Sequence, residues 1–80
     1  MNDATILDGI AQVARDHLGW QGPLTLEMRL VEDLRLDSIR LLTLAAEVEN
    51  RFRVLLDEAD EMAIQTVADL VAIVRRKLAG

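Results

Sequence analysis

With 80 residues the chain can form one compact domain but not two, so we expect a single domain over residues 1–80. Hydrophobic residues make up 51% of the chain, yet aromatic residues only 2%, which favours a helical core of leucine, isoleucine, valine and alanine. Cysteine is absent, which excludes disulfides and thiolate sites, and the net charge of -5 argues against nucleic acid or anionic membranes as partners.

Residues 4–18 are predicted to form the first helix, because their apolar side chains recur at helical spacing along one face. Gly19 should end this helix, since Gly19, Gly22 and Pro23 each disfavour its continuation. His17, the only histidine, falls at the end of the helix, where we expect it to be solvated and without a functional role.

Residues 20–37 form a long connection that contains too many leucines for a solvated linker. We therefore expect it to lie against the core, with Trp20 as its anchor and a turn of helix near residues 28–31.

The second helix is predicted over residues 38–52, with Asp37 or Ser38 as its N-cap. At about 100° per residue its apolar side chains form two stripes on nearly opposite faces. The inner stripe consists of Leu41, Leu44, Ala45, Val48 and Phe52, and the outer stripe of Ile39, Leu42 and Ala46. A small bundle cannot easily bury both, so the outer stripe is a candidate docking surface, although contact with the long connection would also account for it.

Two further helices complete the predicted fold. Acidic side chains at residues 57–61 favour the start of a short third helix, and Thr66 is expected to cap a fourth. The expected core positions of the fourth helix are Val67, Leu70, Val71, Val74 and Leu78, and Arg75, Arg76 and Lys77 would complement the dipole at its carboxyl end. The predicted fold is therefore all-α: a small four-helix bundle with three main helices and a short third one.

The chain shows no basic segment leading into an apolar one at its start, and no apolar run near the roughly 18 residues of a membrane span. We expect a monomeric cytoplasmic protein.

The most informative motif is the sequence Asp-Leu-Arg-Leu-Asp-Ser-Ile at residues 33–39, which places a serine hydroxyl directly before an amphipathic helix. An Asp-Ser-Ile tripeptide after a long leucine-containing loop, followed by a helix that ends in Glu-Asn-Arg-Phe and by an acidic short helix, resembles the acyl carrier proteins and their peptidyl-carrier relatives. The resemblance covers nearly the whole chain.

By this resemblance Ser38 receives 4′-phosphopantetheine from coenzyme A through a phosphodiester bond made by a separate phosphopantetheinyl transferase. The arm ends in a thiol, which this cysteine-free chain lacks, and carries cargo as a thioester. The expected partners are that transferase, an acyl- or aminoacyl-loading ligase, and a downstream transferase or synthase. The cargo is either an acyl group or, in the nonribosomal-peptide type of carrier, an aminoacyl or peptidyl group.

The resemblance also implies which residues partners recognise. Asp37 would help the transferase, the outer stripe would make apolar contacts, and Glu47 and Glu49 would meet basic patches. Two residues after the serine, where the fatty-acid carriers usually have an acid, this chain has Arg40, and Thr43 replaces a frequent glutamate. A less acidic second helix is poorly suited to the ordinary fatty-acid enzymes, so we expect service in a specialised biosynthetic pathway.

Other functions fit the sequence less well. Ser38 as a hydrolase nucleophile would need a nearby base and a glycine-lined turn, and the flanking sequence offers neither, so no catalytic residue is expected. The acids at 57–61 lack the ligand alternation and central glycine of a calcium loop, so no metal site is expected. Composition leaves open a non-covalent helical adaptor that binds a partner protein through the outer stripe.

Overall fold

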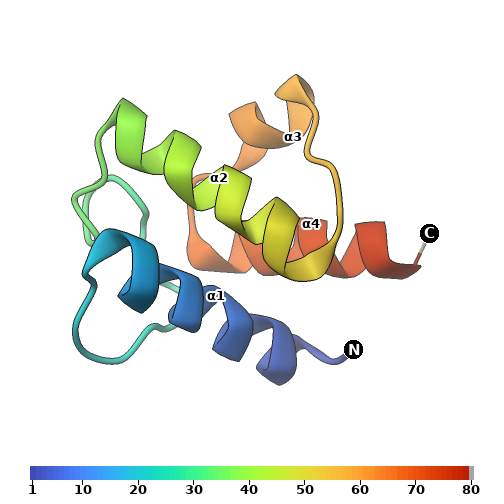
Figure 1. Cartoon of the computed structure of the whole chain (residues 1–80), viewed down its shortest axis with the longest axis horizontal. Coiled ribbons are helices and arrows are strands. Elements are labelled where there is room, and N and C mark those ends of the chain that lie inside the picture. Colours follow the sequence, from blue (N-terminus) through green and yellow to red (C-terminus); the bar gives the residue numbers. More distant parts are fainter. Residues whose placement is uncertain (80) are drawn as a thin grey trace.

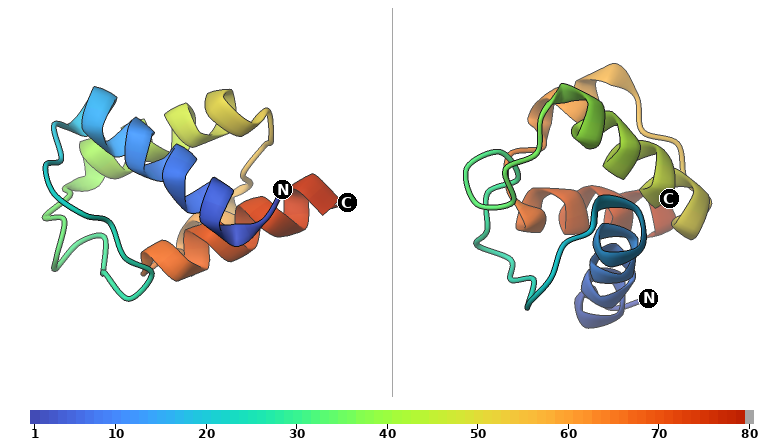
Figure 2. Two further views of the ribbon diagram at one scale, coloured as in Figure 1. Left: turned by 90° about the horizontal axis from the view of Figure 1, so that it is seen from below. Right: turned by 60° about the vertical axis from the view of Figure 1, so that its left-hand side comes forward.

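The computed structural model describes residues 1–79, which form four helices and no strand (Figure 1). The helices are α1 (Asp3–Leu18), α2 (Ser38–Phe52), α3 (Glu58–Ala63) and α4 (Val67–Ala79). The predicted all-α bundle with a short third helix is confirmed. Two views show α1, α2 and α4 enclosing the core, with the long α1–α2 loop at the end opposite the termini (Figures 1 and 2).

Helix α1 begins one residue earlier than predicted because Asn2 caps it, its side-chain oxygen accepting the Thr5 N–H at 2.9 Å. It ends at Gly19 as expected, where φ is 69° and favours glycine. Gly9 faces α2 so closely that a Cβ atom there would lie 2.5 Å from Phe52 Cζ. The α1–α2 contact therefore needs a residue without a side chain at position 9.

The long loop lies against the core, as predicted, and Leu30, Leu34 and Leu36 are buried. Trp20 packs partly buried against the core, which agrees with its predicted anchoring role.

The expected turn of helix near residues 28–31 is wrong. Loop backbone there pairs with the start of α4 instead: the Val67 and Ala68 N–H groups donate to the carbonyls of Met28 and Leu26 at 2.9 Å. These bonds supply acceptors to N–H groups that the first turn of a helix leaves unpaired. The chain turns only afterwards, where the Asp33 N–H donates to the Arg29 carbonyl at 2.9 Å.

Helix α4 contributes five buried residues to the core. Thr66 caps it as predicted, accepting the Asp69 N–H at 3.1 Å, and the Asp69 carboxylate accepts the Gln65 and Thr66 N–H groups, each at 3.0 Å. These two N–H donors lower the pKa of the Asp69 carboxyl. The buried residues are Val67, Leu70, Val71, Ile73 and Val74. The expected core position Leu78 is wrong: it is 38% exposed, because it lies in the last turn, beyond the cover of the other helices.

The short helix α3 is fastened to α4 by one buried carboxylate, that of Asp60. Asp57 and Asp60 form a reciprocal capping box at the start of α3. The Asp60 carboxylate also contacts Arg76 and Lys77 of α4, each at 2.8 Å. The hydrogen bond from Lys77 and that from the Asp57 N–H hold the pKa of Asp60 below its ordinary value. Arg76 and Lys77, which were expected to complement the dipole of α4, therefore also bind the Asp60 carboxylate of α3.

Replacing this acid should weaken the protein at neutral pH but not in acid. A carboxyl whose folded-state pKa is lowered stabilises the fold above its unfolded-state pKa, about 3.9, and loses that contribution as pH falls through the lower folded-state value. Asp60→Asn should therefore lower the free energy of unfolding at neutral pH, and the difference from the unmodified sequence should narrow below about pH 3.9. Urea unfolding across this range measures it, with exposed Glu58→Gln as the control. An equal free energy for Asp60→Asn at neutral pH would contradict the role of this contact.

Candidate functional site around Ser38

Ser38 is the first residue of α2, and its side chain is free because its neighbour caps the helix. Asp37 has extended backbone angles, and its Oδ1 accepts the Arg40 N–H at 2.8 Å. Among residues 1–79 the Ser38 hydroxyl has no hydrogen-bond partner, and the residue is exposed. The explanation of Ser38 as a mere N-cap therefore fails, since Asp37 fills that role.

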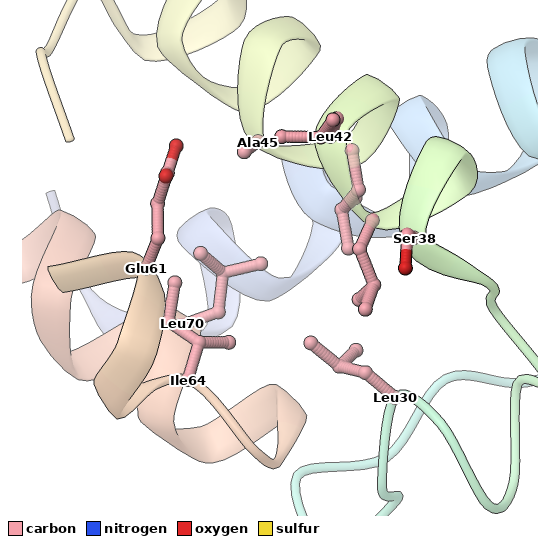
Figure 3. A pocket seen from close by; sticks show the side chains of 9 residues that line it. Leu30, Ser38, Leu42, Ala45, Glu61, Ile64 and Leu70 are labelled. Atoms are coloured by element: carbon pink, nitrogen blue, oxygen red, sulfur yellow. The ribbon is translucent and has the colours of Figure 1, made fainter. Parts of the chain in front are cut away.

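An apolar pocket of about 320 Å³ opens beside Ser38 between α2, α3 and α4. Figure 3 shows Ser38 on one side and Glu61 of α3 on the other, with apolar side chains between them. The lining residues are Leu30, Ser38, Leu41, Leu42, Leu44, Ala45, Glu61, Ile64 and Leu70. Glu61 is the one ionisable group of this lining. A chain attached at Ser38 can therefore reach an apolar recess without crossing the domain.

The sequence did not predict this pocket. Leu41 and Ala45 belong to the inner stripe; both are half-buried, pack against the core and also line the pocket. The pocket is lined by residues of the long loop, α2, α3 and α4, and no local sequence signal specifies how these segments come together. The role of Glu61 as a lining residue was missed for the same reason.

The outer stripe is exposed, as the docking interpretation requires. Ile39 is 75% exposed and Leu42 is 62% exposed, and Ala46 is exposed beside them. None of the three is covered by the long loop, so contact with that loop does not explain them. Asp37, Arg40 and the outer stripe thus surround Ser38 on one half of α2.

The two acids predicted to meet basic partners lie farther along α2, and both have contacts within the domain. Glu47 Oε1 lies 3.3 Å from Nε2 of His17, a histidine that the sequence left without a role. Glu49 Oε2 accepts the Leu56 N–H at 2.8 Å and so fixes the connection from α2 to α3. The structure does not bring Glu47 and Glu49 together with Ser38.

Residues 1–79 contain no cluster of three or more metal-ligating side chains and no helix long and apolar enough to cross a bilayer.

Comparison with known proteins agrees with this geometry. Residues 8–74 match the family described as "Phosphopantetheine attachment site". The chain is 34% identical over 74 residues to an acyl carrier protein of Thermotoga maritima, covering 91% of each chain. It is 29% identical over 72 residues to a meromycolate extension acyl carrier protein of Mycobacterium tuberculosis, covering 63% of that protein's length.

A solved structure assigned as an acyl carrier protein from Mycobacterium tuberculosis superposes with a TM-score of 0.78 and 27% identity, covering 92% of this chain and 95% of that one. Fold and comparisons together define a small helical carrier domain, a class of proteins that present cargo to enzymes. The chain belongs to the acyl carrier protein family, whose prosthetic group is 4′-phosphopantetheine.

The assignment of the cap can be tested by comparing two neighbouring substitutions. Asp37→Ala should lower the free energy of unfolding by about 1 kcal/mol because it removes the acceptor for the Arg40 N–H. Ser38→Ala should change it by less than about 0.5 kcal/mol, since the serine hydroxyl bonds nothing in the fold. Asp37→Asn retains a capping oxygen and serves as the control. Urea unfolding of the three variants decides the question, and a larger loss for Ser38→Ala than for Asp37→Ala would make Ser38 the cap.

Proposed function

We propose that Ser38 is the attachment site of phosphopantetheine and that this chain carries an acyl group on the arm, as a thioester, in a specialised biosynthetic pathway. The observation that carries the proposal is the free, exposed hydroxyl of Ser38 at the start of α2, next to an apolar pocket. Ser38 is also the only serine in the chain, so no other serine competes for the modification.

The surroundings of Ser38 suit a phosphodiester. In the transfer, Ser38 Oγ would bond to the phosphorus that bears the pantetheine arm as the pyrophosphate bond of coenzyme A breaks. Adenosine 3′,5′-bisphosphate would leave, and the serine proton would pass to a base of the transferase. The product phosphate would lie near the N–H groups of the first turn of α2 and the positive end of its dipole, which favour an anion. When bound, the arm supplies a thiol for thioester formation.

The pocket favours an acyl cargo over an aminoacyl or peptidyl one. Its lining is apolar apart from Ser38 and Glu61, so it offers few partners to amide groups or an ammonium. Each methylene group that leaves water for such a pocket gains about 0.8 kcal/mol. The relative named for meromycolate extension gives further support for an acyl cargo.

The chain acts in this proposal as a substrate of other enzymes rather than as a catalyst. The phosphopantetheinyl transferase must reach Ser38, a ligase or transferase loads the thiol, and a synthase or transferase takes the cargo. Approach along α2 would place Asp37, Arg40 and the outer stripe against each of these enzymes, because these residues surround the attachment site.

Mass spectrometry of the intact protein tests the attachment site. After incubation with coenzyme A and a broad-specificity phosphopantetheinyl transferase, the chain should gain one phosphopantetheine, and Ser38→Ala should gain none. Thr43→Ala, which removes the other hydroxyl of α2, should be modified like the unaltered chain, because Thr43 Oγ1 bonds the Ile39 carbonyl. Modification of Ser38→Ala, or no modification of any form by any transferase tested, would contradict the proposal.

The role of the pocket is tested by two adjacent alanines. Ala45 lines the pocket, whereas Ala46 is exposed on the outer stripe. In protein loaded with a medium-length saturated acyl chain, Ala45→Phe should fill the pocket and speed non-enzymatic thioester hydrolysis, about fourfold for each methylene excluded. Ala46→Phe should leave the hydrolysis rate unchanged. Equal rates in both variants and the unaltered protein would show that the pocket does not shelter the cargo.

A further inference from the structure

The side of the pocket opposite Ser38 carries a negative charge. Glu61 of α3 lies there, and its side chain extends toward α2, where Ala45 lines the same pocket (Figure 3). At neutral pH the exposed Glu61 carboxyl group is ionised. It forms no ion pair with another residue of the range 1–79, so no directly contacting base neutralises it. The lining of an otherwise apolar pocket therefore includes one anion.

The bases that bind α3 reduce this negative charge but do not cancel it. Residues 57–63, which comprise α3 and its N-cap, contain four acids and no base. Arg76 and Lys77 of α4 both bind one of these acids, Asp60, at 2.8 Å. All six groups keep their charges, and the four acids outnumber the two bases. The surroundings of Glu61 therefore remain negative.

The Ser38 side of the pocket supplies no compensating positive charge. Arg35 and Arg40 lie near the serine in the chain, but the charges of Asp33 and Asp37 balance theirs. The phosphodiester proposed at Ser38 would add a further negative charge. A carboxylate held in the pocket would therefore meet anions on two sides, and the lining contains no base.

From this arrangement we infer that Glu61 determines cargo specificity: the pocket shelters acyl groups whose chains end in an uncharged group and rejects half-thioesters of dicarboxylic acids. The inference rests on the proposed function and adds to it the class of cargo. An apolar pocket already disfavours a carboxylate, because the carboxylate loses its hydration there. Glu61 adds repulsion. Two like charges about 4 Å apart repel each other enough, even at the dielectric constant of water, to shift an equilibrium about fivefold.

The acids of α3 supply a matched pair of variants. Glu61→Gln removes the charge from the pocket lining and nearly preserves the size of the side chain. Glu58→Gln makes the same change in net charge at another exposed position of α3, one that does not line the pocket. Neither Glu58 nor Glu61 forms an ion pair with another described residue, so neither substitution breaks one.

The experiment compares two cargoes of similar shape on the phosphopantetheine arm. One is the suberoyl group, whose chain ends in a carboxylate, and the other is the 8-methylnonanoyl group, in which an isopropyl group replaces that carboxylate. The measured quantity is the rate of non-enzymatic thioester hydrolysis for suberoyl divided by that for 8-methylnonanoyl. Comparing this ratio between proteins cancels the intrinsic difference in reactivity between the two thioesters.

Glu61→Gln should lower the ratio about fivefold relative to the unaltered chain, because the carboxylate-ended cargo is no longer repelled from the pocket. Glu58→Gln should leave the ratio unchanged. In about 1 M salt the difference between Glu61→Gln and the unaltered chain should shrink, since the Debye length falls to about 3 Å.

The same ratio in Glu61→Gln as in the unaltered chain would overturn the inference and leave loss of hydration as the whole discrimination. An equal fall in both variants would also overturn it, because net charge alone would then account for the effect. So would a difference that salt does not reduce, since shape rather than charge would then be its cause. In all three cases Ser38 still carries the arm, so the proposed function survives. Failure of every form to gain phosphopantetheine would instead contradict the proposed function, and this inference with it.

Discussion

The site depends on which of two neighbouring side chains caps α2. A helix start needs acceptors for its first N–H groups, and Asp37 supplies one with its carboxylate. Ser38 then occupies the first turn with a hydroxyl that the fold does not use. If the serine capped the helix, modifying its oxygen would remove a bond that holds the helix start. Because Asp37 does so instead, a phosphate can be added to Ser38 without loss of that bond.

The pocket has an equally simple physical origin in the way α3 is held. Asp60 is the one buried residue of α3, and its partners Arg76 and Lys77 belong to α4. Burial of this charge is tolerated because two cations and the Asp57 N–H surround the carboxylate. A helix fastened by polar contacts brings few apolar side chains into the core, so the space between α2 and α3 stays open. The short acidic helix α3 thus leaves a recess, which a long apolar helix in the place of α3 would fill.

Much of the fold could be predicted because local signals were strong. Gly19, Asp37 and Thr66 mark helix ends through their own backbone or capping chemistry, and helical periodicity separates the two stripes of α2. The features that could not be predicted depend on contacts between distant segments. The loop near Leu26 and Met28 is not helical, because the carbonyls of these two residues accept N–H groups at the start of α4. Leu78 follows the periodicity but extends past the core.

The same limit applies to the site. Ser38 and its motif are local, so the sequence located them, whereas the pocket and the contacts of Glu47 and Glu49 arise only when distant segments come together. A side chain that already bonds within the fold keeps its charge but is less free to reorient toward a partner. The sequence predicts that Glu49 meets a partner, whereas in the structure its carboxylate accepts the Leu56 N–H.

Leu42 joins the two halves of the site. It belongs to the exposed outer stripe, at 62% exposure, and it also lines the pocket beside Ser38. Any protein that covers the outer stripe therefore touches one wall of the recess, so the proposed docking surface and the proposed shelter for the cargo share a side chain. Arg35 and Arg40 are not among the residues that line the pocket. A substitution at either arginine would therefore change the charge near Ser38 without changing a side chain of the pocket lining.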